Sequence, residues 1–97
     1  MHFGEQIKQL REKRGLLQRQ LAASLEIDTP MFSKIERGDR RAKREHVVQL
    51  AELLDFDVNQ LLSLWLSDQI LDIVSSEEVA LEALQNAATT LKKNKGK

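Results

Sequence analysis

The residues from Gln18 to Gly38 read Gln-Arg-Gln-Leu-Ala-Ala-Ser-Leu-Glu-Ile-Asp-Thr-Pro-Met-Phe-Ser-Lys-Ile-Glu-Arg-Gly, and this stretch decides the fold. Asp28 is well suited to cap a helix that begins after it, and Pro30 falls in the first turn, where its missing N–H costs nothing. Apolar positions recur at helical spacing on both sides of that cap: Leu21, Ala22 and Leu25 before it, Phe32 and Ile35 after it. The pattern predicts two short helices joined by a tight turn, which leaves the outer face of the second helix free to enter a DNA groove.

The first of these helices carries the motif Gln18-x-x-Leu21-Ala22, and the second ends in Ser33-Lys34-Ile35-Glu36-Arg37-Gly38. Together the two motifs resemble the Cro/C1-type (XRE-like) helix-turn-helix family of small bacterial and phage regulators. The resemblance covers about residues 3–62. It implies an all-α, lambda-repressor-like domain of five to six helices that binds double-stranded DNA.

Helical patterns continue on both sides of the two motifs, and no strand pattern is present. Gly15 follows the basic end of the first helix, while Asp57 with Gln60 and Ser75 with Glu78 have capping-box spacing. The predicted helices span about residues 3–14, two segments within 18–38, then 44–54, 58–74 and, after Ser75, up to 93. The predicted core is Phe3, Ile7, Leu10, Leu21, Ala22, Leu25, Ile27, Phe32, Ile35, Val47, Leu50 and Leu54, closed by Leu61 and Leu62.

The resemblance assigns base contacts to the exposed face of the helix after Asp28. We name this surface the reading face, and its members are Thr29, Met31, Ser33 and Lys34. Lysine can donate to guanine, hydroxyls can donate or accept, and an apolar group can touch a thymine methyl. The alternative is that the two hydroxyl residues merely face solvent.

The resemblance implies a phosphate contact for Gln18 at the start of the first motif helix, where a helix N-terminus favours an anion, and its neighbour Arg19 is expected to contact phosphate as well. A run of cations after the reading face is predicted to clamp phosphates, although such a run is often only a solvated surface. This basic cluster consists of Arg37, Arg40, Arg41, Lys43 and Arg44. The resemblance further implies a structural ion pair between Arg11 and Glu36.

Two positions depart from the family pattern. Leu17 stands where Ser or Thr commonly caps the helix, so that cap is missing. Glu26 stands in the turn where Gly is frequent, and a non-Gly residue in a left-handed conformation is strained. Neither departure removes the reading face, but both affect the angle at which it would dock on DNA.

Charge is divided along the chain, although the formal net charge is zero. Residues 1–46 have a net charge of +4, residues 47–91 contain eight acids and no base, and the last six residues add four lysines. A positive end can approach phosphate while the acidic end is held away from it.

Enzymatic sites are not indicated. The chain has no cysteine, no Gly-rich phosphate loop and no metal-ligand spacing, and its two histidines, His2 and His46, are remote in sequence. His46 is expected to face solvent. We therefore predict no enzyme, cofactor or metal, and the lack of a signal-peptide or membrane-span pattern predicts a cytoplasmic protein.

The C-terminal third carries more apolar surface than one packing face can use. Two arrangements remain open: a hairpin of the last two helices folded onto the other four, or a homodimer interface in which the last helix is exchanged or packed across the two-fold axis. The dimer is favoured, with Trp65 as its anchor or as an ordinary core residue. Its predicted interface is Leu62, Trp65, Leu66, Ile70, Ile73, Leu81, Leu84 and Leu91.

The predicted organisation is a DNA-binding domain over residues 1–62, a dimerisation hairpin over 57–93 that continues the same core, and a disordered tail over 94–97. The predicted function is a transcriptional regulator that binds an inverted repeat as a homodimer. It would act as a repressor by competing with RNA polymerase or as an activator by recruiting it. The alternative is an antitoxin or adaptor whose acidic, leucine-rich half binds a protein.

Overall fold

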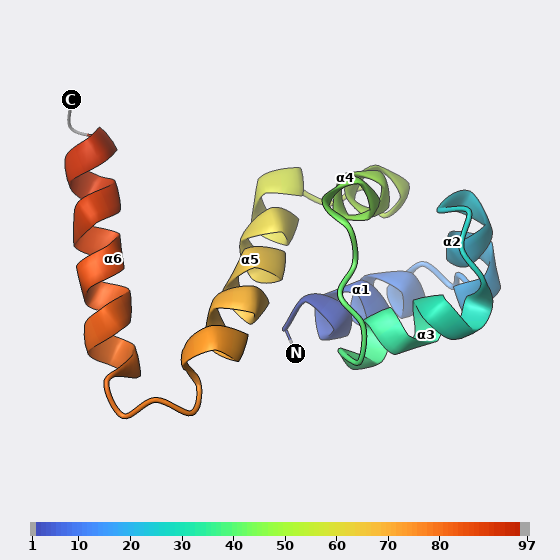
Figure 1. Cartoon of the computed structure of the whole chain (residues 1–97). Coiled ribbons are helices and arrows are strands. Elements are labelled where there is room, and N and C mark those ends of the chain that lie inside the picture. The colour runs from blue at the N-terminus through green and yellow to red at the C-terminus, as the bar shows by residue number, and fades with distance from the viewer. Residues whose placement is uncertain (1, 96–97) are drawn as a thin grey trace.

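The computed structural model describes residues 2–95, which are helical throughout apart from short connections (Figure 1). Its helices are α1 (His2–Lys13), α2 (Gln18–Ser24), α3 (Thr29–Arg37), α4 (Arg44–Leu53), α5 (Val58–Val74) and α6 (Ala80–Lys95). The predicted all-α fold of six helices is confirmed.

Helices α1 to α5 enclose one hydrophobic core, and we call this part of the chain the head. Helix α1 lies against both α3 and α5, while α2 packs on α3 and α4 packs on α5. Most of the predicted core is buried, but Leu10, Ile27 and Leu62 are only partly buried at its edge. The buried apolar residues are Phe3, Ile7, Leu21, Ala22, Leu25, Phe32, Ile35, Ala42, Val47, Leu50, Ala51, Leu54 and Leu61.

The helix ends of the head follow the predicted signals. The Asp28 carboxylate accepts the Met31 N–H at 2.8 Å, and the Asp57 carboxylate accepts the Gln60 N–H at 2.9 Å. Gly38 ends α3 in the left-handed conformation with φ of 83°. The two carboxylates accept N–H groups that the start of a helix leaves unpaired. At the end of α3 the Gly38 N–H donates to a carbonyl of the last turn.

The start of α1 is fixed by residues that are distant in sequence. The Asp68 side chain, on α5, accepts the backbone N–H of His2 at 3.1 Å and of Phe3 at 2.9 Å. Gly4 lies so close to α3 that an added Cβ would collide with the carbonyl oxygen of Glu36 and stand 2.8 Å from that of Ile35. The N-terminus of α1 is therefore held between α3 and α5.

The predicted start of the last helix is wrong. Ser75 is the C-cap of α5 rather than the N-cap of α6, since its N–H donates to the Leu71 carbonyl at 2.8 Å. The N–H of Glu77 then bonds to the Val74 carbonyl at 2.9 Å, which continues the turn past the helix end. Helix α6 begins only at Ala80, after this short link.

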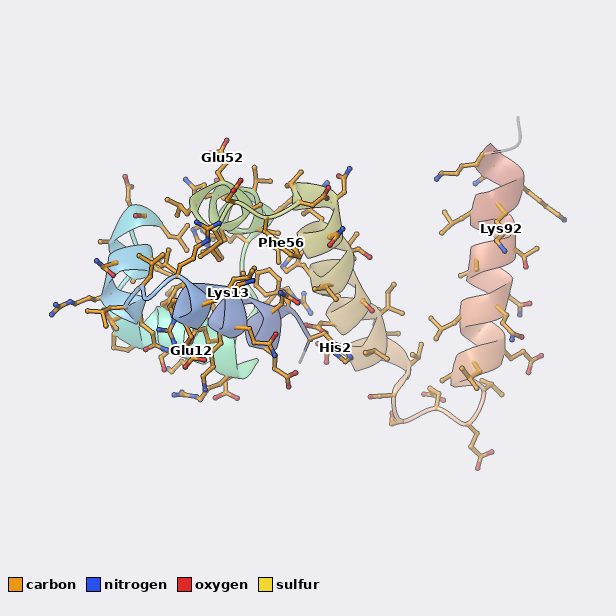
Figure 2. The ribbon with its side chains drawn as sticks, turned by 180° about the vertical axis from the view of Figure 1, so that it is seen from behind. His2, Glu12, Lys13, Glu52, Phe56 and Lys92 are labelled. Atoms are coloured by element: carbon orange, nitrogen blue, oxygen red, sulfur yellow. The ribbon has the colours of Figure 1, made fainter. Side chains whose placement is uncertain are left out.

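Helix α6 stands apart from the head, at the far left of Figure 1. It buries none of its residues, and Figure 2 shows Lys92 far from Phe56 and the rest of the head. The arrangement in which α6 folds onto the other helices of its own chain is therefore not adopted. The helix extends to Lys95, so it includes the first two residues of the predicted tail, and residues 96–97 lie outside the described part.

Candidate nucleic-acid interface

The turn between α2 and α3 is closed by backbone hydrogen bonds. The Ile27 N–H donates to the Ala22 carbonyl at 3.0 Å, while Glu26 takes the left-handed conformation with φ of 59°. This agrees with the strain expected where Gly is frequent, because only glycine adopts that conformation without steric cost. The turn is nevertheless formed, and α3 leaves it capped by Asp28.

The start of α2 lacks a side-chain cap from Leu17, as the sequence predicts. Leu17 is half-exposed, and its backbone N–H donates instead to the Gln20 side-chain oxygen at 2.7 Å. One half of a capping box therefore remains, because the N3 residue still reaches back to the cap position.

An ionic network ties α1, α2 and α3 together. The Arg11 guanidinium donates to both carboxylate oxygens of Glu36, at 2.7 and 3.2 Å, and to the Leu16 carbonyl at 2.9 Å. The Glu36 side chain is only 2% exposed, and the hydrogen bond and charge it supplies raise the pKa of Arg11. A bidentate, nearly buried pair of this kind holds two helices in a fixed orientation.

Gln18 belongs to this network, which the sequence reasoning did not foresee. Its side-chain amide donates to Glu36 at 2.9 Å. The amide is thereby oriented by the ion pair, and it lies at the first residue of α2, where backbone N–H groups are unpaired. The Glu36 carboxylate therefore holds the Gln18 side chain at a fixed position beside α3.

The reading face divides into exposed and partly covered members. Thr29 and Lys34 are exposed on α3. Met31 is half-buried and packs against the core, so much of its side chain faces inward. Ser33 is half-buried too, and its hydroxyl accepts a hydrogen bond from Arg37 at 3.0 Å. Thr29 and Lys34 are therefore the most exposed members of the reading face.

The basic cluster lies at the end of α3 and in the segment before α4. Its five members are exposed. Arg37 pairs with Asp39 at 3.1 Å, and Arg41 lies 3.9 Å from Asp72 of α5. Both pairs are solvent-exposed and correspondingly weak. Within residues 2–95 the remaining members, Arg40, Lys43 and Arg44, are free of ion pairs.

His46 is placed differently from the prediction. The side chain is half-buried rather than facing solvent, and its Nδ1 is buried without a hydrogen-bond partner. The residue lines a hollow between the α2–α3 turn, the basic cluster and α4, together with Met31 and Lys43. His46 lies on the first turn of α4, and this position turns its side chain toward the hollow instead of toward open solvent.

The predicted dimer residues fall into two groups. Leu62 and Trp65 pack against the core of their own head, and the Trp65 indole N–H donates to the Ala42 carbonyl at 2.8 Å. The others lie outside it: Leu66, Ile70, Ile73, Leu81 and Leu91 are exposed, and Leu84 is half-buried. Trp65 thus anchors the loop before α4 to α5, which no local sequence signal indicated.

Comparison with known proteins identifies the head. A family model described as a helix-turn-helix domain matches residues 2–64, which is more than half of the chain. No curated protein and no solved structure matches significantly. Over residues 2–95, no helix is long and apolar enough to cross a bilayer, and no cluster of metal-ligating side chains is present. Proteins built on this domain typically bind DNA and are typically not enzymes. The chain belongs to the helix-turn-helix domain family.

Proposed function

We propose that this chain is a sequence-selective regulator of transcription that binds double-stranded DNA through the major groove. The observation that carries the proposal is the exposed face of α3, where Thr29 and Lys34 project from a helix locked in place by the Arg11–Glu36 pair. Rigid placement matters because hydrogen bonds to base edges depend on position and direction.

The distribution of charge also favours an approach to DNA through the face of α3. The basic cluster adjoins α3, whereas residues 47–91, which cover most of α4, all of α5 and most of α6, have only acidic charges. Cations around the reading face neutralise phosphates and release counterions, and the acidic remainder points the head toward DNA by one side.

The proposed regulator acts in the cytoplasm as a homodimer. The exposed apolar residues of α5 and α6, including Leu66, Ile70 and Leu81, exceed what a monomer usually leaves in water. Two-fold symmetry then presents two copies of α3 about 34–36 Å apart, in successive major grooves on one side of a duplex. The expected operator is an inverted repeat, and a bound dimer represses by excluding RNA polymerase or activates by contacting it.

Binding of selected and random duplexes tests the proposal. Lys34→Ala should weaken the selected duplex by about 5- to 100-fold while changing random-duplex binding little, because one base contact is worth about 1–3 kcal/mol. Lys13→Ala is the matched control: it removes the same charge from α1, outside the reading face and the basic cluster (Figure 2). Equal losses in both variants, on both duplexes, would contradict base reading by Lys34.

A second variant set tests the phosphate contacts. Arg40→Ala and Lys43→Ala should weaken all duplexes alike and reduce the slope of log affinity against log salt by about one each. An unchanged slope would remove the basic cluster from the interface.

The second candidate function is a protein-interaction module of antitoxin or adaptor type. The observation favouring it is α6, which extends from the head without burying a residue and so can engage another protein. The two functions separate cleanly, because an adaptor binds no duplex selectively at any salt concentration.

A further inference from the structure

The apolar positions of α6 form a narrow seam. Leu81, Leu84, Ala88 and Leu91 alternate at three- and four-residue spacing, which is the a/d pattern of a coiled coil. The Leu81 and Leu91 side chains are 76% and 65% exposed within the chain. An isolated helix of this length is marginal in water, so the seam is stable only when another helix covers it.

The order of residues along this seam is symmetric about its centre. When the helix is laid antiparallel against a copy of itself with Asn86 opposite Asn86, Leu81 faces the partner's Leu91 and Leu84 faces the partner's Ala88. The same operation generates each layer twice, as a two-fold axis requires. We propose that α6 pairs antiparallel with α6 of a second copy of this chain.

Charge selects the antiparallel direction. Glu77 and Glu78 precede the seam, and Lys92 and Lys95 follow its last leucine. In the antiparallel pair each acidic end meets the partner's lysines, with Glu78 beside Lys92 and Glu77 beside Lys95. A parallel pair instead places acid against acid and lysine against lysine, which is unfavourable.

The same residues are too far apart to pair within one chain. Glu78 lies just before α6 and Lys92 in its last turns, so the helix separates them by about 18–20 Å. Any coupling between them therefore reports contact between copies.

The role of this pairing rests on the proposed function, in which a dimer brings two DNA-binding heads to one duplex. In each chain a short link joins α5 to the start of α6. In an antiparallel pair the links of the two chains lie at opposite ends of the paired helices, about 24 Å apart for a helix of 16 residues. The heads are thus held on opposite sides of the two-fold axis. Such an arrangement allows two reading faces to meet successive grooves of one duplex.

Disulfide trapping tests the direction of pairing. The natural chain has no cysteine, so Leu81→Cys and Leu91→Cys variants each carry one thiol. Mild oxidation of the mixed full-length variants should yield a cross-linked heterodimer within a pre-formed complex. Each variant alone should cross-link weakly, because residues 81 and 81 of the two copies are about 15 Å apart and a disulfide requires Cα atoms within about 7 Å. Strong cross-linking of each variant alone would show a parallel pair and overturn the inference.

Charge reversal gives an independent measurement by sedimentation equilibrium. Glu77→Lys with Glu78→Lys, and separately Lys92→Glu with Lys95→Glu, should each raise the dimer dissociation constant by about 5- to 30-fold. The four changes together should recover most of that loss. Glu52→Lys, an exposed reversal on α4, is the matched control and should change the constant less than about threefold (Figure 2).

The outcomes separate this inference from the proposed function. A monomer, or a dimer in which the reversals do not compensate, overturns pairing through α6 even if the protein still binds an inverted repeat. A cross-linked antiparallel dimer that binds no duplex selectively supports the pairing and contradicts the regulator.

Discussion

The head and α6 bury their apolar side chains in different ways, although both are helical and leucine-rich. In the head, Phe32, Leu50 and Leu61 are fully buried, while α6 has no buried residue. The head therefore encodes a complete core within one chain. Helix α6 has only a narrow row of apolar side chains on one face. These side chains are buried only when another chain packs against them.

The largest expected difference comes from apolar truncation. Phe32→Ala should lower the free energy of unfolding by about 3–5 kcal/mol, because it leaves a cavity in a closed core. Leu91→Ala, measured at concentrations where the chain is monomeric, should change it by less than about 0.5 kcal/mol. Urea denaturation followed by the fluorescence of Trp65, the only tryptophan, measures both. Similar losses would mean that α6 shares the core of the head.

Removal of the buried ion pair should have the next largest effect. Arg11→Ala leaves the Glu36 carboxylate buried without its cation and should cost about 3 kcal/mol. Arg41→Ala removes one member of an exposed pair with Asp72 and should cost less than about 1 kcal/mol. Thermal unfolding of both variants checks the ratio. The prediction fails if the two variants melt together.

Gly4→Ala tests the close approach of α1 to α3 by the sign of its effect. Helix propensity alone favours Ala over Gly by about 1 kcal/mol, whereas a Cβ against the Glu36 and Ile35 carbonyls should destabilise by about 1–3 kcal/mol. On exposed α6, Asn86→Ala should follow propensity and increase helix content slightly. Denaturation midpoints and circular dichroism measure the two changes. A stabilised Gly4→Ala variant would refute the close contact.

Two equivalent helix caps should differ in function rather than in stability. Asp28→Ala and Asp57→Ala each remove one N-cap hydrogen bond and should each cost about 1 kcal/mol. Only Asp28→Ala should also weaken binding to the selected duplex, because that cap orders the first turn of α3. Denaturation and duplex titration on the same samples separate the effects. A comparable loss of DNA affinity in both variants would show that the loss reflects stability alone.

The parts of the fold that sequence predicted are those with local causes. The Asp28 cap, the Gly38 terminus and the left-handed Glu26 each follow from a residue type acting on its immediate backbone. The Arg11–Glu36 pair was anticipated through family resemblance, and the structure confirms it.

The features that sequence missed depend on contacts between distant segments. Asp68 looks like any surface acid in a helix until the fold brings the start of α1 against it. The same is true of Trp65 and the Ala42 carbonyl. The Ser75–Glu78 spacing has the form of a capping box. In the structure, however, the backbone N–H groups of Ser75 and Glu77 bond to carbonyls of α5 and continue the turn that ends this helix. Local pattern alone does not determine which competing hydrogen bond forms.

The proposed function depends on base reading by the exposed face of α3. Selection of bound duplexes from a random library by the purified full chain, followed by sequencing, tests it most directly. We expect enrichment of one inverted repeat with half-sites about one helical turn apart, and loss of preference at one position of each half-site with Lys34→Ala. Retention of duplexes without any shared sequence, by the natural chain, would contradict it.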